Sequence, residues 1–221
     1  TGVYLSFAIV IFFSLWAAGM TLFDAVNHAF SLAATGGFST RNLSVGYYQS
    51  DLLHLIVIFY MAVCALHFGL IYAVFVTRSL KPMRSSVVGY YFGSIAVASL
   101  IVGLVLRAQG GYDHLGRAMM DSTFTVVSYM STTGFAICDN STWPVVAGVV
   151  LMFVAFQCGC SGSTTGGIKV DRILIAFKSI GNEIRRRVHP NAVSQIRLDG
   201  HYLPDSTVNS VMMYIVTYIL M

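Results

Sequence analysis

The chain has 221 residues, of which 56% are hydrophobic and only 10% are Asp, Glu, Lys or Arg. Soluble domains usually carry about 25% charged residues, because their surface faces water. The composition therefore excludes an ordinary soluble domain and predicts an integral membrane protein. The four cysteines are scattered along the chain, which excludes a disulfide scaffold.

Long apolar stretches predict the membrane spans, since crossing about 30 Å of hydrocarbon takes about 20 apolar residues. Three stretches without Lys, Arg, Asp or Glu meet this length, at residues 2–20, 52–77 and 85–106. A fourth stretch, residues 143–156, covers only about 21 Å as a helix. It runs into the sequence QCGCSGSTTGG, whose glycines and small hydroxyl residues break a helix, before an apolar pattern resumes. We therefore expect a broken helix here. A fifth apolar run, residues 208–221, is cut by the end of the chain. We therefore interpret the chain as an internal piece of a longer membrane protein.

Two shorter segments between the spans have a different character. Residues 22–34 and 116–131 are about half a membrane long and contain polar side chains. Each leads into a cluster of threonine and glycine, TGGFST at 35–40 and TTGFAI at 132–137. Irregular backbone at membrane depth is tolerated only where it is buried in protein or lines water. These segments are therefore predicted to be re-entrant helices followed by glycine loops.

The basic residues predict the orientation in the membrane. If both glycine loops face outside, ten of the thirteen Lys and Arg residues lie on the inner side, as the positive-inside rule requires. The ten are Arg78, Lys81, Arg84, Lys169, Arg172, Lys178, Arg185, Arg186, Arg187 and Arg197. The polar stretch that ends at Pro204 is long enough to form a cytoplasmic contact surface.

The two halves of the chain match at an offset of 97 residues. Each half has the order span, re-entrant helix, glycine loop and span, which is typical of duplicated transporter or channel units. The matching pairs are Asp24 and Asp121, Ser31 and Ser128, Thr35 and Thr132, Gly37 and Gly134, and Phe38 and Phe135.

The glycine loops contain the groups that a permeating cation needs. Backbone carbonyls can replace the water shell of an ion, and glycine allows the backbone conformations that aim successive carbonyls at it. The C-terminal end of each re-entrant helix adds partial negative charge, and neither loop contains a carboxylate, which favours a weakly hydrated monovalent cation over calcium. The predicted filter residues are Thr35, Gly36, Gly37, Thr132, Thr133 and Gly134.

Four motifs, TGGFST, STTGF, GCSGSTTGGIKVDR and RRRVHPNAV, resemble the bacterial Trk/Ktr potassium-uptake membrane subunits, specifically the TrkH type. The resemblance implies an all-α integral membrane fold of the potassium-channel-like superfamily, built from four hairpins of span, pore helix, filter loop and span around one pore. Residues 1–80 match the second hairpin and 81–187 the third. Residues 188–205 match a cytoplasmic connection, and 206–221 the start of the fourth hairpin.

The resemblance also implies a gate. In this family the second span of the third hairpin is interrupted by a flexible intramembrane loop beneath the filter, which residues 158–168 match. Two positions depart from the family pattern: Thr35 stands where TrkH-type proteins have isoleucine, and Cys158 replaces a glycine. The expected gate residues are Gly159, Ser161, Gly162, Ser163, Gly166, Gly167 and Lys169.

The resemblance further implies potassium uptake across the bacterial inner membrane by a homodimer. Each subunit would have its own pore, under control of a cytosolic nucleotide-binding ring of the TrkA type. We expect contact with membrane lipid, no nucleic acid, no organic cofactor on this chain, no metal other than the potassium ion, and no enzymatic activity. The alternative within transport is a sodium-coupled Ktr-type transporter. An intramembrane enzyme that uses Asp24 or Asp121 is disfavoured, because the two aspartates match by duplication and no partner base lies beside both.

Several residues outside the filter leave alternatives. The segment GSTTGGIK is not a Walker A loop, because Ile168 separates the last glycine from the lysine. The pair Cys158 and Cys160 lacks a second pair or a histidine for a metal site and is expected to pack at the helix break.

The charged residues and one histidine also leave their roles open. Asp24 and Asp121 are expected early in their helices, where a carboxylate complements the dipole; attraction of cations to the outer vestibule is the alternative. The charge of Lys169 costs free energy in an apolar run unless the ammonium is paired or faces water. A gating role and a structural role for Lys169 both stay open. His67 is expected to pack inside a span rather than to face the pore.

Overall fold

The first half of the chain forms a helical hairpin unit in which a short helix lies between two apolar ones. The computed structural model describes residues 2–79, 81–188 and 196–221. The elements of the first unit are α1 (Gly2–Ala17), α2 (Leu22–Ala33), the 3-10 turn η1 (Ser44–Tyr47), α3 (Asp51–Cys64) and α4 (Phe68–Thr77).

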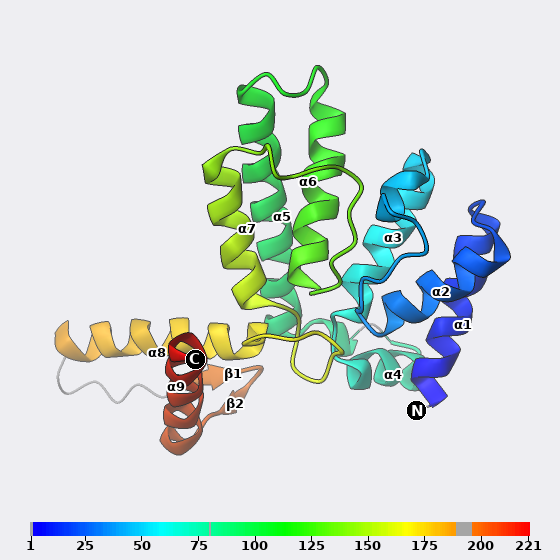
Figure 1. Ribbon diagram of the computed structural model, residues 1–221. Coiled ribbons are helices and arrows are strands. Elements are labelled where there is room, and N and C mark those ends of the chain that lie inside the picture. The colour runs from blue at the N-terminus through cyan, green and yellow to red at the C-terminus, as the bar shows by residue number, and fades with distance from the viewer. Residues whose placement is uncertain (1, 80, 189–195) are drawn as a thin grey trace.

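The second half repeats this order. A 3-10 turn, η2 (Lys81–Met83), leads into α5 (Ser86–Ala108), α6 (Leu115–Met130), α7 (Val145–Gln157) and α8 (Val170–Val188). The chain continues through the two-stranded antiparallel hairpin β1 (Arg197–Leu198) and β2 (His201–Tyr202) into α9 (Asp205–Leu220). In Figure 1, α5, α6 and α7 stand together, and α1, α2 and α3 lie beside them. The predicted order of an apolar helix, a more polar helix, a glycine loop and a second apolar helix is confirmed in both halves.

The helices begin where hydroxyl side chains can satisfy free backbone donors. The hydroxyls of Thr21, Ser50 and Ser85 accept hydrogen bonds from the first-turn amides of α2, α3 and α5, at 3.2, 3.4 and 3.1 Å. Such caps replace the missing intrahelical partners of the first turn. The starts of these three helices therefore follow from local sequence.

Among the described residues, α5 alone is long and apolar enough to cross a membrane, and α3 with α4 qualifies if the bent pair is taken as one span. The span predicted at 85–106 is thus confirmed. The continuous span predicted at 52–77 is wrong, because α3 and α4 meet at 102°. The apolar helices α1 and α7 are shorter, and the predicted break after α7 is confirmed.

Apolar side chains fill the space between the two hairpin units and also cover their outside. Buried residues of both units form one continuous cluster, in which Leu15, Met61, Tyr91 and Phe124 are fully enclosed. Many other large apolar residues are exposed, as expected for a surface that faces lipid. Examples are Leu5, Phe13, Leu55, Val97, Leu104 and Phe153.

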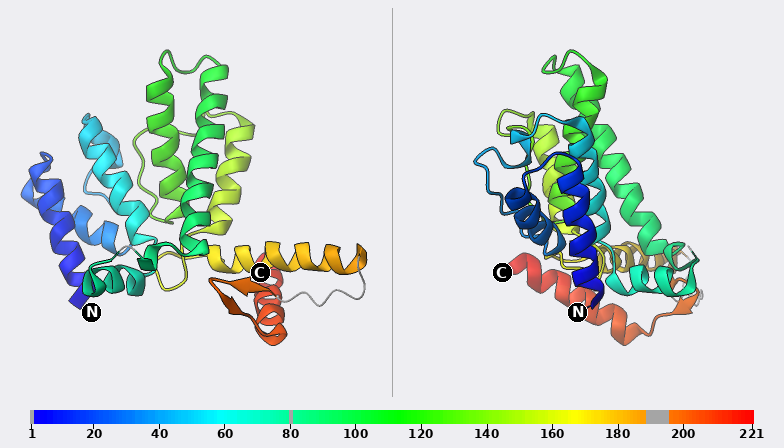
Figure 2. Two further views of the ribbon diagram at one scale, coloured as in Figure 1. Left: turned by 180° about the vertical axis from the view of Figure 1, so that it is seen from behind. Right: turned by 90° about the vertical axis from the view of Figure 1, so that its right-hand side faces the viewer.

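The helix after the break does not continue the line of α7. Figures 1 and 2 show α8 running across the ends of the upright helices, with α9 and the β-hairpin beside it. Ile175 of α8, Ile196 and Val208 of α9 form a separate small apolar cluster. The motif RRRVHPNAV ends α8, and its last five residues, 189–193, lie outside the described part of the chain.

Candidate ion pathway and gate loop

The two predicted filter loops have the same backbone conformation. Thr35 and Thr132 have φ of 50° and 52°, and Gly37 and Gly134 have φ of 71° and 80°. A positive φ is uncommon for threonine and easy for glycine. Equal and unusual angles at positions 97 residues apart confirm the internal repeat in the place where the filter is predicted.

Each loop is attached to the end of its short helix by equivalent hydrogen bonds. The amide of Gly36 donates to the carbonyl of Ser31 at 2.8 Å, and the amide of Thr133 donates to the carbonyl of Ser128 at 3.0 Å. These bonds satisfy carbonyls that a helix terminus leaves free. The predicted filter residues therefore follow directly on the helix C-termini, where the partial negative charge of the helix dipole lies.

The two loops also touch each other. A Cβ added to Gly37 would lie 1.8 Å from the carbonyl oxygen of Thr133, so a side chain at this position is sterically excluded. Further along, the amide of Gly46 donates to the carbonyl of Ala136 at 3.0 Å, and the amide of Ala136 donates to the hydroxyl of Ser44 at 3.3 Å. Sequence reasoning missed Ser44 and Gly46, because their partners lie on the other repeat. Gly134 differs, because its added Cβ meets nothing within 4 Å.

Asp24 ties the chain that leaves the first loop to the start of α2. Its side chain is 2% exposed and forms an ion pair with Arg41 at 2.8 Å. The hydroxyls of Thr40 and Tyr48 donate to the same carboxylate, both at 2.5 Å. The expected position in the first helical turn is confirmed. The sequence did not predict that this carboxylate holds residues 40–48 against the helix.

Asp121 has different partners, although it matches Asp24 in the repeat. Because α6 begins at Leu115, Asp121 lies in the second turn, and the predicted position at the helix start is wrong for this residue. The hydroxyl of Tyr112 donates to it at 2.9 Å, and Arg117 pairs with it at 3.1 Å. Arg117 also reaches Asp51 of α3 at 3.2 Å, an ion pair between the two hairpin units. The two aspartates thus share a position and a structural role but not a set of contacts.

The segment between α7 and α8 makes direct contact with the second filter loop. The amide of Gly166 donates to the hydroxyl of Thr132 at 3.0 Å. From the sequence, the loop and the predicted filter lie on separate elements. The hydrogen bond corrects that view, because a movement of the loop away from the filter breaks it.

The loop starts at a backbone conformation that suits glycine. Cys158 has φ 57° and ψ −161°, a region that essentially only glycine occupies at low cost. The resemblance implies glycine at this position, and cysteine here puts strain at the first residue of the loop. The thiol donates to the carbonyl of Ala155 at 2.7 Å, and it lies where a Cβ on Gly167 would be. The small residues predicted to pack at the break do so.

Lys169 and Asp171 close the other end of the loop, and they do not pair with each other. The Lys169 ammonium donates to the carbonyl of Thr165, and also to its hydroxyl at 3.0 Å. The carboxylate of Asp171 accepts from the amide of Ser161 at 2.8 Å. Each charge therefore stabilises the fold of the loop itself. Of the described residues, no group of three His, Cys, Asp or Glu could hold a metal ion.

Comparison with known proteins agrees with this geometry. The family TrkH, described as cation transport protein, matches residues 2–101 and 86–221. The Trk system potassium uptake protein TrkH of Salmonella typhimurium is 36% identical over 99% of this chain and 45% of its own length. The TrkH protein of Escherichia coli strain K12 is 34% identical, with the same shares covered.

A solved structure is also similar. The crystal structure of the potassium transporter TrkH from Vibrio parahaemolyticus superimposes with a TM-score of 0.92 at 35% identity, covering 98% of this chain and 47% of that one. The all-α membrane fold of the potassium-channel-like superfamily is therefore confirmed. The chain spans about half the length of the relatives it matches.

Proposed function

Because this chain belongs to the TrkH family of cation transport proteins, we propose that it contributes two of the filter loops and the gate of a potassium-uptake pore. The observation that carries the proposal is the pair of matched loops. Both place a left-handed threonine and a left-handed glycine directly after a short helix, and their backbones touch at Gly37 and Thr133.

The filter residues would act through oxygen atoms. Backbone carbonyls around Thr35–Gly37 and Thr132–Gly134 would replace the hydration shell of a potassium ion, the transported substrate. The positive φ values turn successive carbonyls in directions that a regular helix does not allow. Two further loops of the same kind would complete a fourfold ring, as the relatives of twice the length suggest.

The loop at 158–169 would act as the gate. Its direct hydrogen bond to Thr132 supports this role, and its glycines permit more than one backbone arrangement. The Lys169 ammonium, held inside the loop by Thr165, would place a positive charge near the ion path while the loop is closed. A cation approaching it would be repelled.

The wider setting is also part of the proposal. The relatives are named as components of a Trk system, which supports a cytosolic regulatory partner of the TrkA type and a homodimer of longer subunits. The basic residues Arg185, Arg186 and Arg187 at the end of α8 support a multi-pass protein of the bacterial inner membrane with its filter loops outside. No feature favours sodium coupling over a channel. The aspartates that an intramembrane enzyme would use are occupied by structural contacts.

The test is rubidium uptake by cells that lack other potassium-uptake systems and express the full reading frame encoding this chain. We expect growth at low potassium and rubidium uptake that competes with potassium far better than with sodium. The control is the same frame with both Gly37 and Gly134 changed to serine, which should reach the membrane but lose the preference for potassium. Absence of uptake by the unmodified protein at normal abundance in the membrane would contradict the proposal.

A further inference from the structure

The break between α3 and α4 lies against the gate loop, although the two belong to different hairpin units. Ala65 and Leu66 are fully buried in the break. The amide of Cys160 donates to the carbonyl of Ala65 at 2.8 Å, and the amide of Phe68 donates to the carbonyl of Gly162 at 3.4 Å. Backbone hydrogen bonds thus run in both directions between the break and the loop.

These bonds explain why α3 stops where it does. In a continuous helix the carbonyl of Ala65 would accept from the amide of Gly69. Here Cys160 supplies the donor, so the carbonyl remains satisfied while the chain turns by 102°. The segment at Ala65–His67 contains neither proline nor glycine, so the break depends on the loop that contacts it.

The side chain of His67 forms a wall beside the loop. His67 is exposed and lies at the start of α4, so the predicted packing inside a span is wrong. A Cβ added to Gly162 would lie 2.3 Å from His67 Cδ2 and 2.5 Å from Nε2. A Cβ added to Gly159 would lie 2.7 Å from the carbonyl oxygen of Ala65. Glycine at these two positions therefore allows the loop to approach the break at backbone distance.

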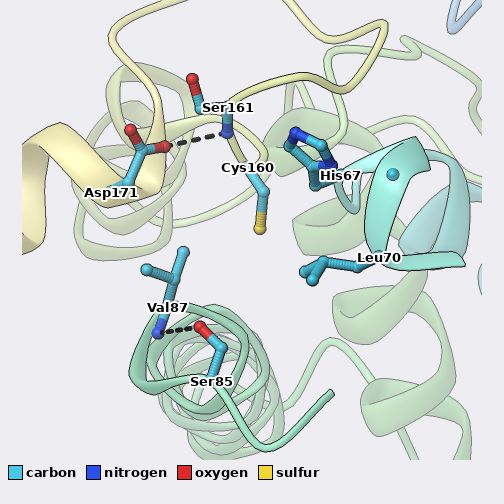
Figure 3. A pocket seen from close by; sticks show the side chains of 8 residues that line it. His67, Leu70, Ser85, Val87, Cys160, Ser161 and Asp171 are labelled. Atoms are coloured by element: carbon cyan, nitrogen blue, oxygen red, sulfur yellow. Dashed lines mark hydrogen bonds between the residues drawn. The ribbon is translucent and has the colours of Figure 1, made fainter. Parts of the chain in front are cut away.

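A cavity beside this contact offers the loop a place to move. In Figure 3, His67 and Leu70 lie on the right of this cavity, and Asp171 lies on the left. Ser85 and Val87 lie below, and Cys160 and Ser161 of the loop lie between Asp171 and His67. The cavity has a volume of about 440 Å³. Because two gate-loop residues line it, a displaced loop can enter it without first pushing helices apart.

We propose that the gate loop docks on the α3–α4 break when the pore is closed and that His67 positions the loop there. We call this docking site the seat of the gate loop. The second hairpin would thereby hold the gate of the third one closed. Opening would break the hydrogen bonds at Ala65 and Phe68 and lift Gly162 from the imidazole ring. The inference rests on the proposed gating role of residues 158–169.

The main test compares two substitutions at one position in the full reading frame. The variant His67→Ala removes the wall, so we expect rubidium uptake without the cytosolic partner to rise by about threefold or more and stimulation by the partner to shrink. The variant His67→Phe keeps a ring of similar size and should stay close to wild type. The potassium-to-sodium preference should not change in either, because neither substitution alters a residue of the predicted filter loops. A merely structural defect would lower uptake and membrane abundance, which is the opposite sign.

A second pair of variants tests the same contact without changing His67, so its result does not depend on whether the His67 variants fold. Gly162→Ala pushes a methyl group into His67 at a residue with φ +76° and should give the same partner-independent uptake. Gly148→Ala lies in α7, outside the gate loop, and its added Cβ meets nothing within 4 Å. It is the matched control and should behave as wild type.

The possible results separate the seat from the gate. Wild-type uptake and partner dependence in both His67→Ala and Gly162→Ala would overturn the seat. If deletion of part of the loop also changes nothing, the gate itself is misassigned; if the unmodified protein takes up no rubidium, the proposed function fails first. Partner-independent uptake in Gly162→Ala, together with wild-type behaviour of Gly148→Ala, supports the seat even where His67→Ala does not reach the membrane.

Discussion

The two hairpin units break their last span at the same place in the repeat but in different ways. Adding 97 to Ala65 gives 162, in the middle of the gate loop, so the α3–α4 break and the 158–169 segment are equivalent positions. The first break is short, free of glycine and buried at Ala65 and Leu66, and the second is long and rich in glycine. With the proposed gating role, one position of the repeat serves as a fixed support in the first unit and as a movable part in the second. Each segment satisfies backbone groups of the other.

Deleting part of the long break, for example residues 163–166, should have the largest effect. It removes the contact with Thr132 and shortens the segment that lies against the filter. We expect rubidium uptake without the partner to rise by about tenfold, with little further increase when the partner is added. Uptake assays with and without the partner measure this. Equal uptake and equal partner dependence in wild type and deletion would mean that both breaks are structural.

The filter loops provide a comparison within the repeat. Gly37→Ser places a side chain against the carbonyl of Thr133, whereas Gly134→Ser meets open space and is opposed only by its positive φ. We expect the preference for potassium over sodium to fall by about tenfold in Gly37→Ser and by a few-fold in Gly134→Ser. Competition of sodium with rubidium uptake measures both. Equal losses would show that backbone conformation alone, and not the contact between the loops, sets selectivity.

A smaller effect is expected where one filter threonine contacts the gate and the other does not. Thr132 accepts the amide of Gly166, whereas the hydroxyl of Thr35 donates to the neighbouring carbonyl of Ala34 at 2.7 Å. Thr132→Val removes a hydrogen bond worth about 1 kcal/mol, so partner-independent uptake should rise by about two- to fivefold. Thr35→Val is the matched control, with partner dependence unchanged. A response to Thr35→Val as large as that to Thr132→Val would contradict the asymmetry.

The smallest expected effect concerns the anchor below the third hairpin. Asp199, in the turn of the β-hairpin, accepts from the hydroxyl of Ser85 at 2.7 Å and from the amide of Ser86 at 2.6 Å at the start of α5. Burial opposes ionisation of Asp199, but these hydrogen bonds outweigh it and lower the pKa of its carboxyl. The stabilisation is therefore present above the ordinary carboxyl pKa and is lost as pH falls through the lowered value.

Asp199→Asn should weaken this anchor at neutral pH by about 1 kcal/mol or less, because the site is exposed to water. Hydrogen exchange of the Ser86 and Val87 amides measures the change. Exchange should become faster in the variant at neutral pH, and the difference from wild type should shrink in acid. A difference that grows as pH falls would have the wrong sign for a carboxylate with a lowered pKa.

Local sequence predicted the elements whose conformation depends on neighbouring residues. The span at 85–106 followed from its length and lack of charge, and the end of α7 followed from the glycines after Gln157. The positions of the filter loops followed from the repeated threonine and glycine. The repeat also contained a signal that was not used: the offset of 97 maps the gate loop onto residues 61–72, inside the segment predicted as one continuous span.

The tertiary structure decided the contacts between the two repeats. No local feature at Ala65–His67 stops a helix, so the break appears only when Cys160 donates to the Ala65 carbonyl. The close approach of Gly37 to Thr133, and the different partners of Asp24 and Asp121, likewise depend on groups far apart in the chain. Sequence alone determined the membrane class, the repeat and the loops, because these depend on composition and local backbone preference. The contact between the proposed gate loop and the α3–α4 break depends on hydrogen bonds between segments about 100 residues apart, and only the folded chain brings those segments together.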